Sequence, residues 1–265
     1  MRPAMGTLVQ VDARGSAAER SIEAAFAAIE LVDRLMSFHD AQSELSRLNR
    51  EAARAPQTVH AWTWAVLRRA LAIAEASNGL FDITVAPLLV KQGLLPGTAN
   101  PTLECGVSRD IVLMPQCQVF FRRPLLVDLG GIAKGFAIDV AIHALRRSGC
   151  TEAAVNAGGD LRRFGQQAQP IHLRRRDGLM KVAELRCGAI ATSAPHAEHP
   201  ERLAQPLGSI FDPHAKRAWN GGEAVMVAAP SCVIADAFTK VAALAGPSSA
   251  PLLARFGAKA LWMEG

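Results

Sequence analysis

A chain of 265 residues, half of them hydrophobic and one fifth charged, can bury a substantial core, which excludes a disordered chain. The formal net charge of +5 suits an anionic ligand but is also common among ordinary proteins, so charge alone assigns no function. The basic residues are scattered and form no stripe interleaved with aromatic residues, so nucleic acid is not an expected partner.

The five cysteines and the hydropathy of the chain bear on its compartment. The cysteines are widely spaced, odd in number and without a CxxC pair, so the sequence predicts neither a zinc site nor a redox pair. No apolar run reaches the length of a membrane-spanning helix, so no integral membrane segment is expected. Residues 1–7 lack the apolar core of a secretory signal. We therefore expect a cytoplasmic protein, or a periplasmic one if a leader precedes this chain.

The first half of the chain predicts a strand, two helices and a loop region. Leu8–Val11 is typical of a strand, and Ala17–Met36 carries apolar residues at helical spacing. The same spacing recurs over Ala61–Ala76, where Gly79 follows as a typical helix-ending residue. Residues 95–118 are rich in Pro, Gly, Thr and Cys and predict loops with short strands.

The second half mixes short strands with two further helices. Leu125–Val127 predicts a short strand, followed by a glycine turn and a helix that continues to about Arg147. Ala153–Val155 predicts another strand, and Ala235–Leu244 a second helix. Because strands and helices do not alternate as in a doubly wound sheet, we expect an α+β fold.

Two pairs of adjacent glycines are candidates for ligand contact. Gly130 and Gly131 precede the helix that carries Lys134, and glycine at a helix N-terminus lets backbone N–H groups approach a phosphate. The pattern is neither GxGxxG nor GxxxxGK[ST], which argues against Rossmann and P-loop sites. Gly158 and Gly159 favour a second loop lining the same cleft. The alternative is that both pairs are tight turns.

Eight segments occur together and in order, and through them the chain resembles the ApbE-like FAD:protein FMN transferases over nearly its whole length. They are Met5–Thr7, Met36–His39 with Ser43–Asn49, Gly79–Val85, Asp128–Asp139, Asn156–Asp160, Ala191–Ser193, Ile210–Pro213 and Ala235–Lys240. The resemblance implies a single α+β domain over residues 1–265, folded as two lobes with an FAD cleft between them.

The resemblance also implies a reaction. FAD is the substrate, Mg²⁺ sits on its pyrophosphate, and a Ser or Thr hydroxyl of an acceptor flavoprotein attacks the FMN-side phosphorus and expels AMP. Two alternatives stay open: hydrolysis of FAD to FMN and AMP, and a catalytically weakened protein that binds and delivers flavin.

A set of FAD contacts is carried over by motif, and His39 stands there in place of the family's usual tyrosine. An imidazole can still stack on a ring. Other roles are open for some members, since Phe81 could be a core residue, Asp82 a cap and Met5 a strand residue. The expected contacts are Met5, His39, Phe81, Asp82, Ile83, Asp128, Gly130, Lys134, Gly158, Gly159, Ser209 and Ile210.

The implied metal site contains a departure from the family. Its ligands are the carbonyl of Gly131, the carboxylate of Asp236 and an oxygen side chain four residues later, where this chain has Lys240. Thr239 could supply the missing oxygen, or the ammonium group of Lys240 could itself neutralise pyrophosphate charge. The third alternative is an exposed ion pair between Asp236 and Lys240 with little effect.

A second departure concerns catalysis. The family's usual histidine base is replaced by Ser209, and serine does not accept a proton at neutral pH. His214, just beyond the Asp212-Pro213 turn, is the candidate base, and the alternative is a solvent-exposed histidine. Asp236 is the second candidate catalytic residue. Phosphoryl transfer depends more on positioning and charge neutralisation than on a strong base, so loss of the histidine need not abolish activity.

Overall fold

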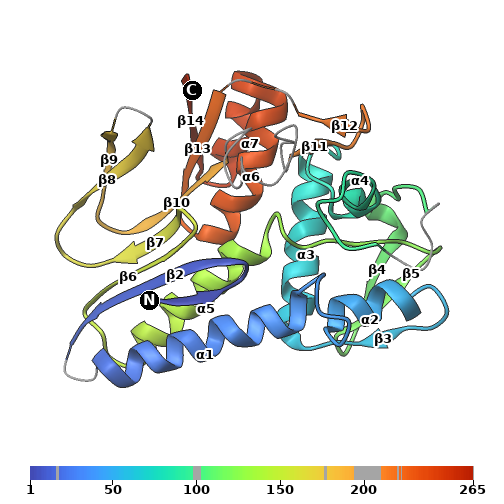
Figure 1. Ribbon diagram of the computed structural model, residues 1–265, viewed down its shortest axis with the longest axis horizontal. Helices are drawn as coiled ribbons and strands as arrows, with labels where there is room; N and C mark the ends of the chain where they lie inside the picture. Colours follow the sequence, from blue (N-terminus) through green and yellow to red (C-terminus); the bar gives the residue numbers. More distant parts are fainter. Residues whose placement is uncertain are drawn as a thin grey trace.

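A seven-stranded antiparallel sheet is the centre of the fold (Figure 1). The computed structural model describes residues 1–15, 18–97, 103–175, 178–193, 210–219, 221 and 223–264. The strands of this sheet, in spatial order, are β1 (Arg2–Ala4), β2 (Thr7–Arg14), β6 (Glu152–Ala157), β7 (Asp160–Phe164), β10 (Gly188–Ser193), β13 (Glu223–Ala229) and β14 (Lys259–Glu264).

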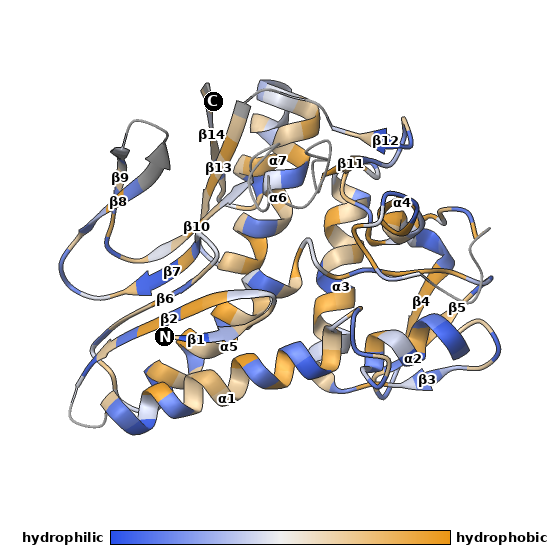
Figure 2. Cartoon of the chain, viewed as in Figure 1, coloured by the Kyte–Doolittle hydropathy of each residue, from blue (hydrophilic) through white to orange (hydrophobic). Residues whose placement is uncertain are grey.

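Three helices pack against this sheet. They are α1 (Ala18–Met36), α5 (Ala133–Arg147) and α6 (Cys232–Ala245), with α1 against α5 and α5 against α6. Along α1, hydrophobic and hydrophilic residues alternate in patches (Figure 2), as expected for a helix that buries one face. Helix α6 is apolar on most of its surface and almost wholly buried.

A second group of elements lies beside the first and shares one continuous hydrophobic core with it (Figure 1). Strands β3, β5 and β4 form a small antiparallel sheet, and the short 3-10 turn η1 leads into α4. The elements are α2 (Glu44–Glu51), β3 (Gln57–Thr58), α3 (Ala61–Ala76), η1 (Ile83–Val85), α4 (Ala86–Lys91), η2 (Ser108–Asp110), β4 (Ile111–Met114) and β5 (Gln118–Phe121).

Four further strands, a 3-10 turn and a short helix complete the described fold. Strands β8 and β9 form a hairpin that projects from the body (Figure 1), and β11 pairs with β12. In the described part of the chain, no helix is both long and apolar enough to cross a membrane. The bounds are β8 (Gln169–Arg175), β9 (Gly178–Leu185), β11 (Phe211–Asp212), β12 (Arg217–Ala218), η3 (Gly246–Ser249) and α7 (Ala250–Arg255).

The α+β class and the four predicted helices are confirmed, but the predicted strand at Leu125–Val127 is wrong. This segment is buried, and a side chain takes the place of a neighbouring strand. Asn49 accepts a hydrogen bond from the Val127 N–H (2.8 Å) and donates one to the Val127 carbonyl (3.0 Å). The apolar run therefore reflects burial rather than sheet pairing.

Helices α5 and α6 cap each other at their N-termini. The carboxylate of Asp139 on α5 accepts hydrogen bonds from the N–H groups of Cys232 (2.8 Å) and Val233 (3.0 Å). In return, Asp236 on α6 accepts one from the N–H of Gly135 (3.0 Å). A Cβ on Gly135 would overlap the Cys232 carbonyl, so glycine permits this close crossing. The crossing brings two positive helix ends together.

Candidate active site

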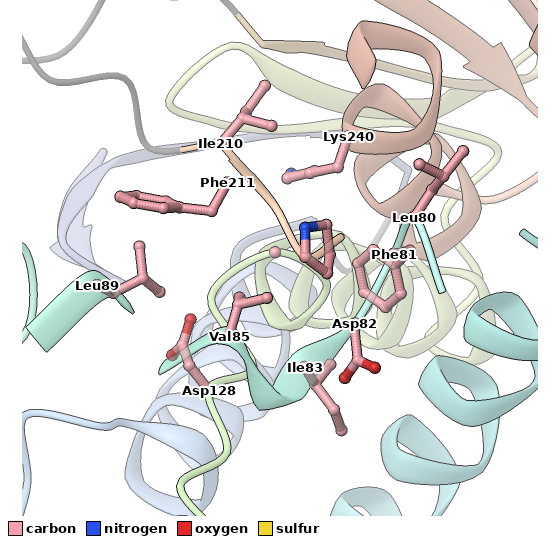
Figure 3. A pocket seen from close by; sticks show the side chains of 12 residues that line it. Leu80, Phe81, Asp82, Ile83, Val85, Leu89, Asp128, Ile210, Phe211 and Lys240 are labelled. Atoms are coloured by element: carbon pink, nitrogen blue, oxygen red, sulfur yellow. The ribbon is translucent and has the colours of Figure 1, made fainter. Parts of the chain in front are cut away.

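A pocket opens where the two groups of elements meet (Figure 3). Its walls come from η1 and α4, from the loop that precedes α5, from the start of β11 and from α6. Most of the lining side chains are apolar, and the charged ones come from three different elements. The lining residues are Leu80, Phe81, Asp82, Ile83, Val85, Leu89, Asp128, Gly131, Ile210, Phe211, Pro213 and Lys240.

Gly131 lies between an aromatic and a basic side chain of this pocket. A Cβ placed on Gly131 would lie 3.5 Å from Cε of Lys240 and 3.6 Å from the ring of Phe81. The main chain at Phe81 is fixed by a hydrogen bond, in which the Phe81 N–H donates to the hydroxyl of Ser77 at 3.1 Å. The pocket thus joins an apolar wall to a cationic group at the glycine turn.

Two aspartates of the lining have different environments. Asp82 is the N-cap of η1, since its carboxylate accepts hydrogen bonds from the N–H and the hydroxyl of Thr84, both at 2.8 Å. Its role as a cap is therefore confirmed. Burial raises the pKa of Asp128, while a hydrogen bond from the Gly130 N–H and the nearby His39 act in the opposite direction.

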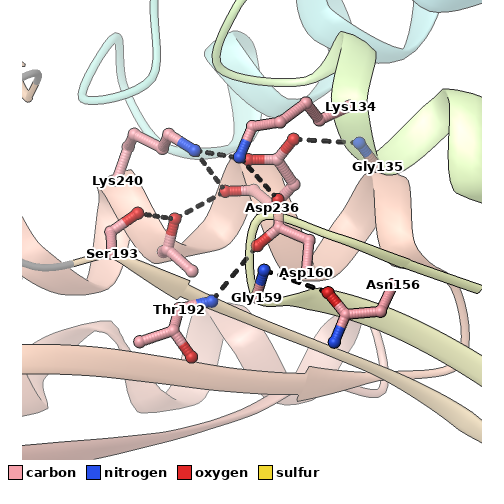
Figure 4. Close-up of polar contacts among 10 residues, drawn as sticks. Lys134, Gly135, Asn156, Gly159, Asp160, Thr192, Ser193, Asp236 and Lys240 are labelled. Atoms are coloured by element: carbon pink, nitrogen blue, oxygen red, sulfur yellow. Dashed lines mark hydrogen bonds and ion pairs between the residues drawn. The ribbon is translucent and has the colours of Figure 1, made fainter. Parts of the chain in front are cut away.

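Beside the pocket, two ion pairs form a cluster of four charged residues (Figure 4). Lys134 at the start of α5 contacts Asp160 at the start of β7, with 2.9 Å between Nζ and Oδ2. Lys240 contacts Asp236 one turn earlier on α6. Both carboxylates are buried, with 1% of each residue exposed, whereas both lysine side chains are partly exposed. The cluster has no net charge when all four groups are ionised.

Asp160 has a perturbed protonation equilibrium. Burial, and secondly the charge of nearby Asp236, raise the pKa of Asp160 to about 6, while Lys134 and Lys240 oppose this shift. Its second carboxylate oxygen faces the N–H of Thr192 at 3.3 Å. Two carboxylates and two ammonium groups therefore interact within one buried site.

The oxygen atoms of Asp236 are engaged within the protein. Oδ2 accepts the N–H of Gly135, and Oδ1 contacts the ammonium group of Lys240. The main-chain carbonyl of Asp236 accepts from the Thr239 hydroxyl (2.7 Å) and from Lys240 (3.1 Å). The hydroxyl of Thr239 also lies 2.8 Å from that of Ser193. The predicted ion pair exists, but the alternative of an exposed pair is wrong because Asp236 is buried.

The second glycine pair forms a hairpin turn between β6 and β7. Gly158 and Gly159 have φ angles of +60° and +95°, as a tight two-residue turn requires. A Cβ on Gly158 would lie 2.9 Å from the hydroxyl of Thr7. Met5 lies in the adjacent β1–β2 turn with a φ of +54° rather than in a strand. The turn interpretation is confirmed, and this turn places Asp160 in the charged cluster (Figure 4).

The structure describes His214, the candidate base, but not Ser209, which stands at the position of the family's usual histidine. Ser209 lies outside the described residues, although the next residue, Ile210, lines the pocket. His214 is exposed, and its Nε2 lies 2.9 Å from the carbonyl oxygen of Asn78. Pro213 reaches the pocket, whereas His214 is not among its described lining residues.

Two aspartates that hold the site together, Asp160 and Asp139, have no role in the sequence prediction beyond ending a motif. Asp160 directly follows a glycine hairpin turn, and Asp139 stands in the second turn of the helix that carries Lys134. The sequence around each aspartate does not predict its hydrogen-bond partner, because the partners lie on distant segments. Lys134 is 26 residues from Asp160, and Cys232 is 93 residues from Asp139.

Comparisons with known proteins bear on the family and on the fold. The model of the ApbE family matches residues 5–262. An FAD:protein FMN transferase of Vibrio cholerae is 28% identical over 78% of this chain and 68% of its own length, and that of Escherichia coli K12 is 24% identical over 98% and 81%. The crystal structure of the ApbE protein of Thermotoga maritima superposes with a TM-score of 0.84 at 25% identity, over 98% of this chain and 92% of that one. The Pseudomonas stutzeri flavinyl transferase ApbE gives 0.83 at 21% identity, over 100% and 89%. The chain belongs to the ApbE family.

Proposed function

We propose that this chain is an FAD:protein FMN transferase that moves FMN from FAD to a Ser or Thr hydroxyl of an acceptor flavoprotein. The observation that carries the proposal is the charged cluster, with its two lysines, beside an apolar pocket in a chain of the ApbE family. An apolar wall suits a flavin ring, and paired ammonium groups at a helix N-terminus suit a pyrophosphate.

The proposed FAD contacts follow from the positions of the pocket residues. Phe81, Ile83 and Ile210 supply apolar surface, and Asp128 supplies a polar group. Lys134 lies next to the glycine turn at the start of α5, where backbone N–H groups and the helix dipole favour negative charge. The remaining expected contacts, among them Met5, His39, Gly158 and Gly159, stay predictions.

The proposed step is a phosphoryl transfer. The acceptor hydroxyl oxygen forms a bond to the FMN-side phosphorus, and the bond between that phosphorus and the bridging oxygen breaks. AMP leaves with the bridging oxygen, and the hydroxyl proton is released to solvent. The lysines stabilise the charge that develops on the phosphate oxygens.

Magnesium is expected from the resemblance, but the donors in this structure do not fit a divalent ion as they stand. Mg²⁺ requires several oxygen ligands in near-octahedral arrangement. Both carboxylate oxygens of Asp236 already have partners, one of them the ammonium group of Lys240, and Thr239 directs its hydroxyl to a main-chain carbonyl. No group of three or more His, Cys, Asp or Glu residues in the described ranges could hold a metal.

The test is a transfer assay with three separable results. Purified protein is incubated with FAD and a flavoprotein that carries a target threonine, and the intact mass of the acceptor is measured together with released AMP and free FMN. A matched acceptor with the threonine replaced by valine is the control. We expect covalent FMN on the threonine form only, with AMP released in equal amount.

The other results contradict the proposal in distinct ways. AMP with free FMN and an unmodified acceptor would identify a pyrophosphatase. Binding of FAD without AMP release would identify a flavin carrier. Calorimetry gives a separate check, because contacts to the pyrophosphate predict tighter binding of FAD than of FMN.

A further inference from the structure

Among the described residues that line the pocket, Lys240 is the only cation. Its ammonium group contacts the buried carboxylate of Asp236, and its Cε lies beside the glycine turn at Gly131. Figures 3 and 4 show the same side chain in two settings, since it lines the pocket in one and belongs to the charged cluster in the other. Lys240 therefore connects the cluster to the space where a ligand would bind.

Without a ligand, the two lysines and two aspartates of the cluster balance in charge. Lys134 and Lys240 match the charges of Asp160 and Asp236. A divalent ion placed at Asp236 would adjoin the ammonium group of Lys240, and like charges in a partly buried site repel strongly. An ion bound to Oδ1 of Asp236 would therefore require Lys240 to move away.

The hydrogen bonds of the Lys240 ammonium group also favour a role for this group in ligand binding. An ammonium group has three N–H donors. Within the described ranges, the ammonium group of Lys240 has two acceptors, which are Oδ1 and the main-chain oxygen of Asp236. A third donor is thus available for a phosphate oxygen, while the carboxylate holds the side chain in place.

We propose that Lys240 is a built-in cation of this site, which occupies the place of a divalent metal ion, so that FAD is bound and cleaved without one. The proposal deepens the proposed function and rests on it, because FAD is the assumed ligand. Lys240 would contact the pyrophosphate, and Asp236 would act as a positioning residue for Lys240.

The first measurement requires no catalysis. Mn²⁺ is the probe, because it prefers the same oxygen ligands as Mg²⁺ and is counted by electron paramagnetic resonance. In the presence of FAD, we expect wild-type protein to bind no more Mn²⁺ than free FAD does. Lys240→Thr, which removes the cation and adds an oxygen, should bind Mn²⁺ at least about tenfold more tightly than wild type. Lys259→Thr removes an exposed lysine on β14 and is the matched control.

The second measurement compares AMP release in EDTA and in Mg²⁺. Wild type and Lys259→Thr should have the same rate in both to within about twofold, whereas Lys240→Thr should lose roughly a hundredfold in EDTA and recover in Mg²⁺. Lys240→Arg keeps the charge and should stay independent of metal. Thermal unfolding of each variant verifies that it is folded, and Lys240→Met replaces Lys240→Thr in the EDTA comparison if the latter is not.

Two results would overturn the proposal. One is Mn²⁺ binding by wild type as tight as by Lys240→Thr, together with loss of wild-type rate in EDTA. The other is a folded Lys240→Thr that gains no Mn²⁺. Both leave the transferase function intact, whereas absence of AMP release under every condition contradicts that function and leaves the Mn²⁺ measurement to decide the role of Lys240.

Discussion

At the crossing of α5 and α6, the N-terminus of each helix is capped by an aspartate of the other helix, but only one of the two caps adjoins the pocket in the described structure. At each end a largely buried aspartate of one helix caps the N-terminus of the other, Asp139 for α6 and Asp236 for α5. Each aspartate also contacts a basic side chain, Arg162 at the first end and Lys240 at the second. The second cation lines the pocket, whereas Arg162 is absent from its described lining.

The difference shows which polar contacts of the crossing serve stability alone. Asp139 accepts two backbone N–H bonds and the guanidinium of Arg162 at 2.6 Å, so its oxygens are satisfied by fixed parts of the fold. Burial raises the pKa of Asp139, and Arg162 opposes that shift. In the described structure, the Asp236 carboxylate accepts one backbone N–H, that of Gly135, and contacts the ammonium group of Lys240, which lines the pocket. The first end stabilises the crossing, and the second also positions a cation.

The largest effect is expected for Asp236→Asn. The amide keeps an acceptor for the Gly135 N–H but loses the charge that holds Lys240. We expect AMP release to fall by about two to three orders of magnitude, as for loss of other transition-state electrostatics. Steady-state AMP assays with saturating FAD measure this. A variant with an unchanged rate would place Asp236 with Asp139 as a purely structural cap.

Asp139→Asn is the matched variant at the other end. It leaves the guanidinium of Arg162 without its carboxylate partner, and breaking a buried ion pair costs about 3 kcal/mol of unfolding free energy. Urea unfolding measures this loss. We expect the folded protein to keep its affinity for FAD, because Asp139 does not line the pocket in the described structure. If Asp139→Asn instead has normal stability and impaired FAD binding, Asp139 has a role in ligand binding and the assignment of a purely structural role to it is wrong.

Local patterns predicted the helices but not their pairing. The spacing of apolar residues in Ala17–Met36 and Ala61–Ala76 predicted bounds within one residue, because one buried face per helix leaves a periodic signal. The same reasoning failed at Leu125–Val127, where an apolar run signals burial and the side chain of Asn49 supplies the hydrogen bonds. The pattern of apolar residues therefore indicates whether a segment is buried, but it does not indicate which groups form hydrogen bonds with its backbone.

The site was only partly predictable for a related reason. Motif order brought out Lys134, Asp236 and Lys240, and the structure places all three in one cluster. The contact between Gly135 and Asp236 joins residues 101 positions apart, and no local pattern encodes such a pair. The role of Asp160 likewise depends on the turn between β6 and β7, after which its carboxylate contacts Lys134 on α5.

The smallest expected effect is a dependence of stability on pH that comes from Asp160. Its pKa is about 6 in the folded protein against an ordinary value of 3.8, so between these values the folded state holds a proton that the unfolded state has lost. The stabilising contribution of this protonation is fully present below pH 3.8 and is lost as pH rises to about 6. Asp160→Asn removes the titration. We therefore expect wild type to gain stability relative to Asp160→Asn as pH falls from about 6 to about 4, by at most about 1.4 kcal/mol per pH unit. Urea unfolding of both proteins across this range measures the difference in unfolding free energy. If this difference is constant with pH, or changes in the opposite direction, the pKa of Asp160 is not raised. The effect of Lys134 on that pKa would then be at least as large as the effect of burial.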